Sequence, residues 1–236
     1  MKRILLLLLG IFSVAVSRAA TVSWSATPNA GTNAGLVDNT AAVLAVGNFL
    51  RIGYFTGLTD SQVSSNALTL SGISTLNSNF HEFANTTVGS GTGNTAGTFN
   101  AAPSPPYSSL PGFVPGSQIY FWALKSTNNS SLANALSSTT ATAIAYVPFA
   151  NLSAWQFPAT DVSPASTISV SDLINANSQF LAGTYPSNVS SLTATFGATN
   201  HALQLAAVAA VPEPSVLTFL GMAALASAAS RRRKRG

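Results

Sequence analysis

The chain has 236 residues and a sequence pI near 9.8, with 7% charged residues and no cysteine. Eight of the ten Lys and Arg residues lie at the two ends, while Arg51 and Lys125 stand against five acidic residues in between, so residues 20–210 carry a net charge of −3. A weakly acidic body displaces few counterions from phosphates, which argues against nucleic acid as a partner. The lack of cysteine excludes disulfides, thiolate metal sites and a cysteine nucleophile.

The first 19 residues have the order of a secretion signal. A short basic start precedes an apolar run at residues 4–16, which contains five consecutive leucines. Ser17 and Ala19 then supply small residues at the −3 and −1 positions of a signal peptidase site. The apolar run is too short to span a membrane comfortably, since a membrane helix needs ~20 apolar residues. We therefore expect a signal helix at residues 1–19 and a mature chain that begins at Ala20.

The body, residues 20–210, is long enough for one domain of ordinary size. It is apolar and nearly uncharged, so it lacks the composition of a disordered chain, and its polar surface must come from Ser, Thr, Asn and Gly. The clearest β-type run, residues 118–124, is apolar on both faces, which predicts a central strand covered on both sides. Similar runs between turn signals predict strands at residues 21–26, 42–46, 49–55, 118–125, 141–149, 154–157, 167–170, 192–196 and 203–208.

One segment of the body has helical rather than β spacing. Gaps of three and four separate several of its apolar residues, which are Leu58, Val63, Leu70, Ile73, Leu76, Phe80 and Phe83. Thr59 or Asp60 is expected to cap the start, and Gly72 to divide the segment into two short helices. The expected fold is therefore mainly β: a single antiparallel β-sandwich with a short helical insertion, flanked by the signal helix and a C-terminal transmembrane helix.

Catalytic and metal-binding patterns in the body are weak. A metal site from His81, Glu82 and His201 would require the fold to bring residue 201 beside residue 81. A serine–histidine triad is spatial and stays open, although no G-x-S-x-G motif is present. Asp161 and Asp172 are the candidates for paired carboxylates of glycoside hydrolysis, against the simpler interpretation that both are turn acids.

Aromatic side chains offer a different function, the binding of sugars. Rings that are exposed in a row stack on sugar rings, and five candidates exist: Trp24, Tyr54, Trp122, Tyr146 and Trp155. Burial of an aromatic side chain is worth ~2–3 kcal/mol, which favours a place in the core for most of them.

The last 26 residues have three parts in a fixed order. Val211, Pro212, Glu213 and Pro214 come first, and the two prolines favour an extended segment. An apolar run at residues 216–229 follows, marginal in length for a transmembrane helix, with flanking arginines that can snorkel. The final part is a basic block that stops translocation and stays on the cytoplasmic side: Arg231, Arg232, Arg233, Lys234 and Arg235.

This tail, residues 211–236, resembles the PEP-CTERM sorting signal of Gram-negative-type bacteria, and residues 211–214 match its namesake motif. The same type of tail is also labelled an ice-binding protein C-terminal domain, a label that describes the tail and not the body. The resemblance implies processing near the motif by an exosortase, a membrane-embedded cysteine peptidase. It also implies delivery to the outer surface or to an exopolysaccharide matrix.

The sequence thus predicts an exported, non-enzymatic surface or matrix protein without a cofactor, anchored transiently in the inner membrane. The expected partners are signal peptidase, an exosortase-type peptidase, the membrane and exopolysaccharide. The first alternative is a secreted carbohydrate-binding module on the same scaffold. The second is a secreted hydrolase, which the shortage of His, Asp, Glu and Lys disfavours.

Overall fold

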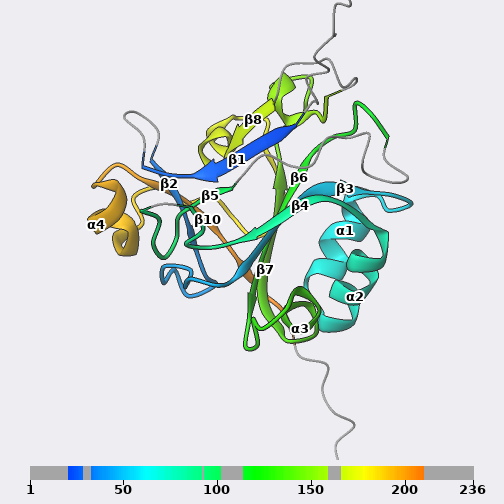
Figure 1. Ribbon diagram of the computed structural model, residues 1–236, viewed down its shortest axis with the longest axis horizontal. Coiled ribbons are helices and arrows are strands. Elements are labelled where there is room, and N and C mark those ends of the chain that lie inside the picture. Colours follow the sequence, from blue (N-terminus) through cyan, green and yellow to red (C-terminus); the bar gives the residue numbers. More distant parts are fainter. Residues whose placement is uncertain (1–20, 29–32, 92, 102–113, 159–165, 210–236) are drawn as a thin grey trace, which may run out of the picture.

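The computed structural model describes residues 21–28, 33–91, 93–101, 114–158 and 166–209. These residues form a mainly β fold with a few short helices, which confirms the predicted class (Figure 1). The signal helix expected at residues 1–19 and the transmembrane helix expected at residues 216–229 lie outside the described residues. Within the described residues, no helix has the length and apolar character needed to span a membrane.

The main sheet contains six strands in the order β11-β7-β6-β3-β4, and β9 also pairs with β7. All of its pairings are antiparallel. Its strands are β3 (Phe49–Phe55), β4 (Phe80–Thr87), β6 (Tyr120–Ser126), β7 (Thr139–Tyr146), β9 (Gln179–Ala182) and β11 (Ala206–Ala207).

Strand β6 lies between β7 and β3, and both of its faces are buried, as its sequence predicts. Phe121 and Ala123 belong to the core on one face of the sheet, whereas Trp122 and Leu124 belong to the core on the other. Successive side chains of a strand point to opposite faces, so an uninterrupted apolar run requires a layer on each side.

The first of these layers consists of two smaller sheets. Strand β1 (Val22–Ala26) lies between β5 (Phe99–Ala101) and β8 (Ser166–Ser169), and β2 (Ala34–Val37) pairs with β10 (His201–Gln204). Their buried side chains share one core with β3, β6 and β7. The β1–β8 and β2–β10 pairs are parallel, so the expectation of a purely antiparallel arrangement is wrong. Alternation of apolar residues along a strand carries no information about the direction of its partner.

The second layer consists of helices α1 (Asp60–Ala67), α2 (Leu70–Asn79) and α3 (Leu132–Ser137), which cover the opposite face of the main sheet (Figure 1). Thr59 caps α1: its hydroxyl accepts from the Gln62 amide at 3.3 Å, and the Gln62 side chain accepts from the Thr59 amide at 2.9 Å. This reciprocal pair is a capping box, and it confirms Thr59 as the cap.

The helical segment divides at Leu68 and Thr69, where α1 ends and α2 is capped, and not at Gly72 as the sequence suggested. Gly72 lies in the first turn of α2, where a Cβ atom would collide with the backbone of Asn66, so glycine permits the two helices to approach closely. The helical segment predicted from the spacing also extends too far along the chain, because Phe80 and Phe83 belong to β4.

Three further strand predictions are wrong. Residues 192–196 form the end of a 3-10 turn, η4 (Ser190–Leu192), and helix α4 (Thr193–Phe196), which buries Leu192 and Phe196 together. Of residues 154–157, Ala154 and Trp155 belong to the 3-10 turn η2 (Ser153–Trp155), and Gln156 forms only an isolated bridge. Residues 42–46 likewise contribute only an isolated bridge at Val43. Leu192 and Phe196 are four residues apart, a spacing that a helix satisfies as well as a short apolar strand does.

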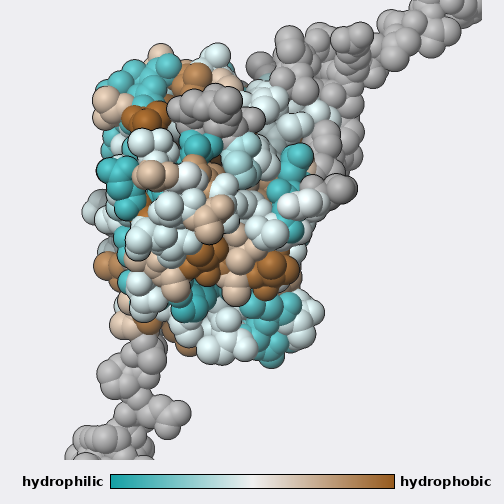
Figure 2. All heavy atoms as spheres, turned by 90° about the vertical axis from the view of Figure 1, so that its left-hand side faces the viewer, coloured by the Kyte–Doolittle hydropathy of each residue, from teal (hydrophilic) through white to brown (hydrophobic). Residues whose placement is uncertain are grey.

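The surface shown in Figure 2 is largely pale and teal, the colours of near-neutral and hydrophilic residues, with brown residues scattered among them. Among the described residues, the exposed large hydrophobic side chains come from five separate segments: Val46, Leu68, Val114, Phe149 and Ile174. On this face, hydrophilic and near-neutral residues therefore separate the exposed apolar ones.

Candidate functional site

The point where the tail leaves the body is the described feature closest to the predicted sorting motif. The Ala209 amide donates to the Leu68 carbonyl at 2.9 Å, and the Leu70 amide donates to the Ala209 carbonyl at 3.4 Å. One residue earlier, the Val208 amide donates to the Thr140 carbonyl of β7 at 2.9 Å. The chain is thus bonded to the α1–α2 junction and to the main sheet up to the last described residue.

A groove lies beside this exit, between α2 and α3. It has a volume of about 240 Å³ and mixes apolar and small polar side chains, namely Leu70, Ser74, Asn77, Ala133, Leu136 and Ser137. Leu70 belongs both to the groove and to the backbone pair with Ala209, so the groove opens next to the place where the tail begins. Neither α2 nor α3 contains an Asp, Glu, Lys or Arg residue.

The predicted sorting and processing residues themselves lie outside the described residues. They are Val211, Pro212, Glu213 and Pro214, the signal peptidase residues Ser17, Ala19 and Ala20, and the basic block Arg231, Arg232, Arg233, Lys234 and Arg235. Asp161, one of the two candidate glycosidase carboxylates, also lies outside them.

The three candidate metal ligands have other partners. His81 is hydrogen-bonded to the Thr56 hydroxyl at 3.0 Å, and Glu82 is ion-paired with Arg51. His201 lies in β10, in a different sheet, with its ring stacked on Tyr185. Within the described ranges, no group of three His, Cys, Asp or Glu residues is arranged to hold a metal ion. The metal site proposed from spacing is therefore not assembled from these residues.

Asp172 is a turn acid, as the simpler interpretation held. Its carboxylate accepts from the Ser169 amide at 2.8 Å and from the Trp155 indole N–H at 3.0 Å, which caps the 3-10 turn η3 (Val170–Ile174). Burial raises the pKa of Asp172, and the two hydrogen bonds oppose that effect. The carboxylate thus joins two turns of the chain.

Most of the candidate sugar-stacking aromatics are core residues. Trp24, Trp122 and Trp155 are at most 1% exposed, and Tyr54 is also buried. Trp122 donates its indole N–H to the Thr142 hydroxyl at 2.8 Å within the core. These four rings are therefore closed to a sugar outside the protein, whereas Tyr146 is partly exposed.

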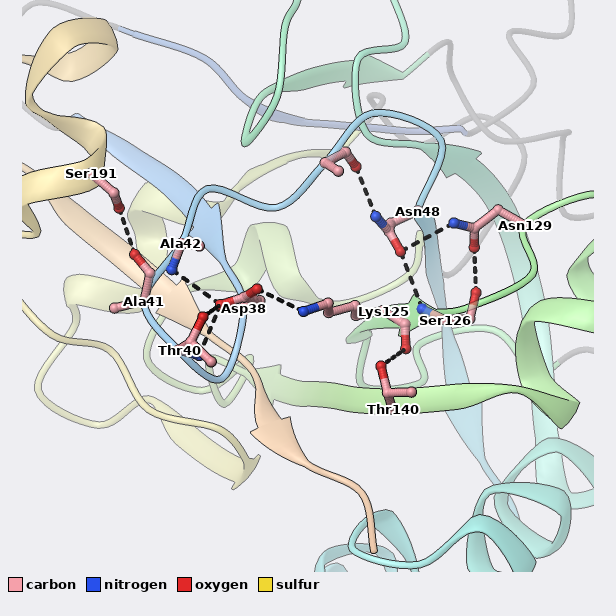
Figure 3. Close-up of polar contacts among 11 residues, drawn as sticks. Asp38, Thr40, Ala41, Ala42, Asn48, Lys125, Ser126, Asn129, Thr140 and Ser191 are labelled. Carbon is pink, nitrogen blue, oxygen red and sulfur yellow. Dashed lines mark hydrogen bonds and ion pairs between the residues drawn. The ribbon is translucent and has the colours of Figure 1, made fainter. Parts of the chain in front are cut away.

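Asp38 organises the turn that follows β2, as Figure 3 shows. One carboxylate oxygen accepts from the Thr40 amide at 2.8 Å, the Thr40 hydroxyl at 2.7 Å and the Ala42 amide at 3.0 Å. The other oxygen accepts from the Lys125 ammonium of β6 at 2.7 Å. Burial alone would raise the pKa of Asp38, but these donors outweigh it and lower the pKa from 3.8 to about 2.

This carboxylate makes stability depend on pH. Because the folded-state pKa of Asp38 is about 2 and the unfolded value is 3.8, its contribution is complete above 3.8 and is lost as pH falls towards 2. In the parent protein we expect this loss of stability to be about 1–2 kcal/mol. Lys125→Met removes the strongest donor to Asp38, so the loss should be smaller in that variant. Urea unfolding at pH 6, 4 and 2.5 measures the difference, and identical pH profiles for the two proteins would contradict it.

A second ion pair lies on the helix-covered face of the main sheet. Arg51 Nε donates to Glu82 Oε2 at 2.5 Å, and Arg51 Nη1 donates to Asn77 Oδ1 of α2 at 3.0 Å. The guanidinium carbon lies 4.6 Å from the Phe80 ring centroid and 4.7 Å from that of Trp122. Burial lowers the pKa of Arg51, while the charge and hydrogen bond of Glu82 act in the opposite direction. This arginine fastens α2 to the sheet.

Asp60 provides a second polar link between helix and sheet. Its two oxygens accept from the Tyr120 hydroxyl at 3.1 Å and from the Tyr146 hydroxyl at 2.5 Å. Burial, reinforced by the nearby Asp60 carboxylate, raises the pKa of both tyrosines well above 10, so both remain protonated donors. The start of α1 is thereby held against β6 and β7.

No family model, curated protein or solved structure matches the chain.

The ion pairs Arg51–Glu82 and Lys125–Asp38 are contacts that the sequence does not predict. Arg51 pairs with a residue 31 positions away and Lys125 with one 87 positions away, so no local motif identifies them. The sequence gives one indirect signal, the small number of charged residues. A body with only two basic and five acidic residues is expected to use several of them in internal ion pairs and not only at its surface.

Proposed function

We propose that this chain is an exported cell-surface or matrix protein, with a β-sandwich body that is delivered by a PEP-CTERM-type sorting tail. The observation that carries the proposal is the fixed order of motif, apolar run and basic block in residues 211–236. The two sheet layers around a shared core support the β-sandwich part. The chain is bonded within the body up to Ala209, two residues before the motif begins at Val211.

The chemistry of the body supports a structural rather than a catalytic role. Each described Asp, Glu, Lys or Arg side chain of the body makes an internal contact: Asp38 with Lys125, Arg51 with Glu82, Asp60 with two tyrosines, and Asp172 with a turn and an indole. General acid–base catalysis requires a titratable group that can reach a substrate. These groups are engaged in holding the layers together, and we propose no cofactor.

Export predicts a defined new N-terminus. When the full chain is produced in a bacterium with an intact secretion pathway, the exported protein should begin at Ala20, because Ser17 and Ala19 occupy the −3 and −1 positions. N-terminal sequencing or intact mass of the exported fraction measures it. Secreted material that still begins with Met1 would refute this part of the proposal, and Ala19→Arg, which blocks the −1 position, serves as the control.

Carbohydrate binding and hydrolysis remain the competing classes, and direct assays separate them. Retention of the purified mature protein on immobilised polysaccharides would favour a carbohydrate-binding module. Turnover on a panel of polysaccharides and esters would favour a hydrolase. The burial of Trp24, Trp122 and Trp155 removes the rings with the greatest stacking area, which counts against the carbohydrate-binding module.

A further inference from the structure

We propose that the end of the body formed by the α1–α2 junction and α3 faces the lipid surface of the membrane while the tail is anchored. This inference rests on the proposed function, because it requires residues 216–229 to be inserted in the bilayer. It adds an orientation of the body and a lipid-facing surface, which the sorting tail alone does not define.

The first step is the position of the exit. The backbone of Ala209 is bonded to Leu68 and Leu70 on the α1–α2 junction, and that of Val208 to Thr140 on β7. Leu70 also lines the groove shared by α2 and α3. The tail therefore begins at this end of the body.

The second step is the length of the connection. Seven residue steps separate Ala209 from Val216, where the apolar run begins. At ~3.3–3.6 Å per residue the connection spans at most about 25 Å. A folded body of ~190 residues has a radius of gyration of about 16 Å, hence a diameter of roughly 40 Å. The connection is shorter than the body is wide, so the exit end cannot turn to the side of the body that is farthest from the membrane.

The third step is the chemistry of the surface at that end. The helices beside the exit, α2 and α3, have no charged residue, and their exposed positions include Ser74, Asn77 and Ser137. Leu68, at the junction itself, is 46% exposed. Such a surface is neither repelled nor attracted by anionic headgroups, so we expect its proximity to the lipid to be independent of lipid charge.

The chain contains no cysteine, so a single introduced thiol can be labelled uniquely. Ser137→Cys places a fluorophore on α3, and Thr167→Cys places one on β8, which lies at the opposite end of the body in Figure 1. Both positions are exposed. Ser74→Cys on α2 is a second position near the exit, in case the α3 variant does not fold.

The labelled full chains are incorporated into vesicles of phosphatidylcholine that carry nitroxide headgroups, with and without phosphatidylglycerol. We expect labels at Ser137 and Ser74 to be quenched severalfold more than the label at Thr167, equally in both vesicle types. Equal quenching at the two ends of vesicle-bound protein would overturn the orientation and leave membrane anchoring intact. A chain that does not float with the vesicles would instead overturn the anchoring itself, and the inference with it.

A linker variant tests the cause of the orientation. Twenty Gly/Ser residues inserted after Ala209 add a flexible segment with a root-mean-square length of about 25 Å, comparable to the whole original connection. The quenching difference should then largely disappear. If it persists, the helix end is attracted to lipid by itself and the short connection is not the cause.

Discussion

Glu213→Ala is expected to abolish trimming of the tail while export across the inner membrane continues. Glu213 is the only charged residue between Asp172 and Arg231, so it is the natural contact for a basic pocket in the processing peptidase. Hydrogen bonds to a charged group are roughly twice as strong as neutral ones. Intact-mass analysis of the envelope fraction should therefore show a form that has lost residues 1–19 but keeps the tail.

Two variants sharpen this result. Glu213→Gln keeps the shape of the side chain and removes its charge, and it should accumulate the same tail-bearing form. Ser215→Ala changes an adjacent residue and should be processed like the parent protein. If the Glu213→Ala protein were trimmed as efficiently as the parent, residues 211–214 would act only as a spacer, and the sorting interpretation of the motif would be wrong.

Glu82→Ala is expected to cause the largest loss of stability among the polar variants, about 3 kcal/mol. It leaves the Arg51 guanidinium, which packs against the Phe80 and Trp122 rings, without its counter-ion, and the Arg51 side chain is only 4% exposed. Equilibrium unfolding in urea at neutral pH measures the change, and the slope of the transition should remain that of the parent protein.

The paired variant Arg51→Met with Glu82→Ala distinguishes a buried charge from lost packing. Replacing buried ion pairs by apolar residues is often neutral, so the double variant should recover most of the lost stability. Lys125→Met is a matched control at an ion pair whose lysine is 36% exposed, and it should cost ~1 kcal/mol or less. A double variant as unstable as Glu82→Ala would show that Arg51 matters for its packing on the aromatic rings rather than for its charge.

The parts of the fold that the sequence predicts are those with an unambiguous local pattern. Residues 49–55 and 118–125 combine aromatic and branched side chains with turn signals at both ends, and they form β3 and most of β6. The capped start at Thr59 is equally local. The strand prediction for residues 192–196 is wrong because two apolar residues that are four positions apart fit a helix as well as a strand.

The prediction that Phe80 and Phe83 belong to the helical segment is wrong for a related reason. Their spacing of three continues the helical pattern of α2, but in β4 they serve the cores on opposite faces of the sheet. Only tertiary packing determines that the helix ends at Asn79, because the sequence carries no proline or glycine there. For the candidate site, the tail is a contiguous motif and visible in the sequence, whereas the anchoring of Ala209 depends on contacts with residues 68 and 70, far back along the chain.

The parallel pairing of β1 with β8 and of β2 with β10 has a consequence for the order in which the chain folds. Strand β1 is completed on one side by β5 and on the other by β8, and β2 is completed by β10 near the end of the body. Contacts between such distant residues form slowly, because a long loop must close before they contribute stability. An emerging N-terminal half therefore contains β5 but lacks β8 and β10, the parallel partners of its first two strands. If the chain is exported as we propose, the body would become complete only after residue 204 had crossed the membrane, when the tail would be next to enter the translocation channel.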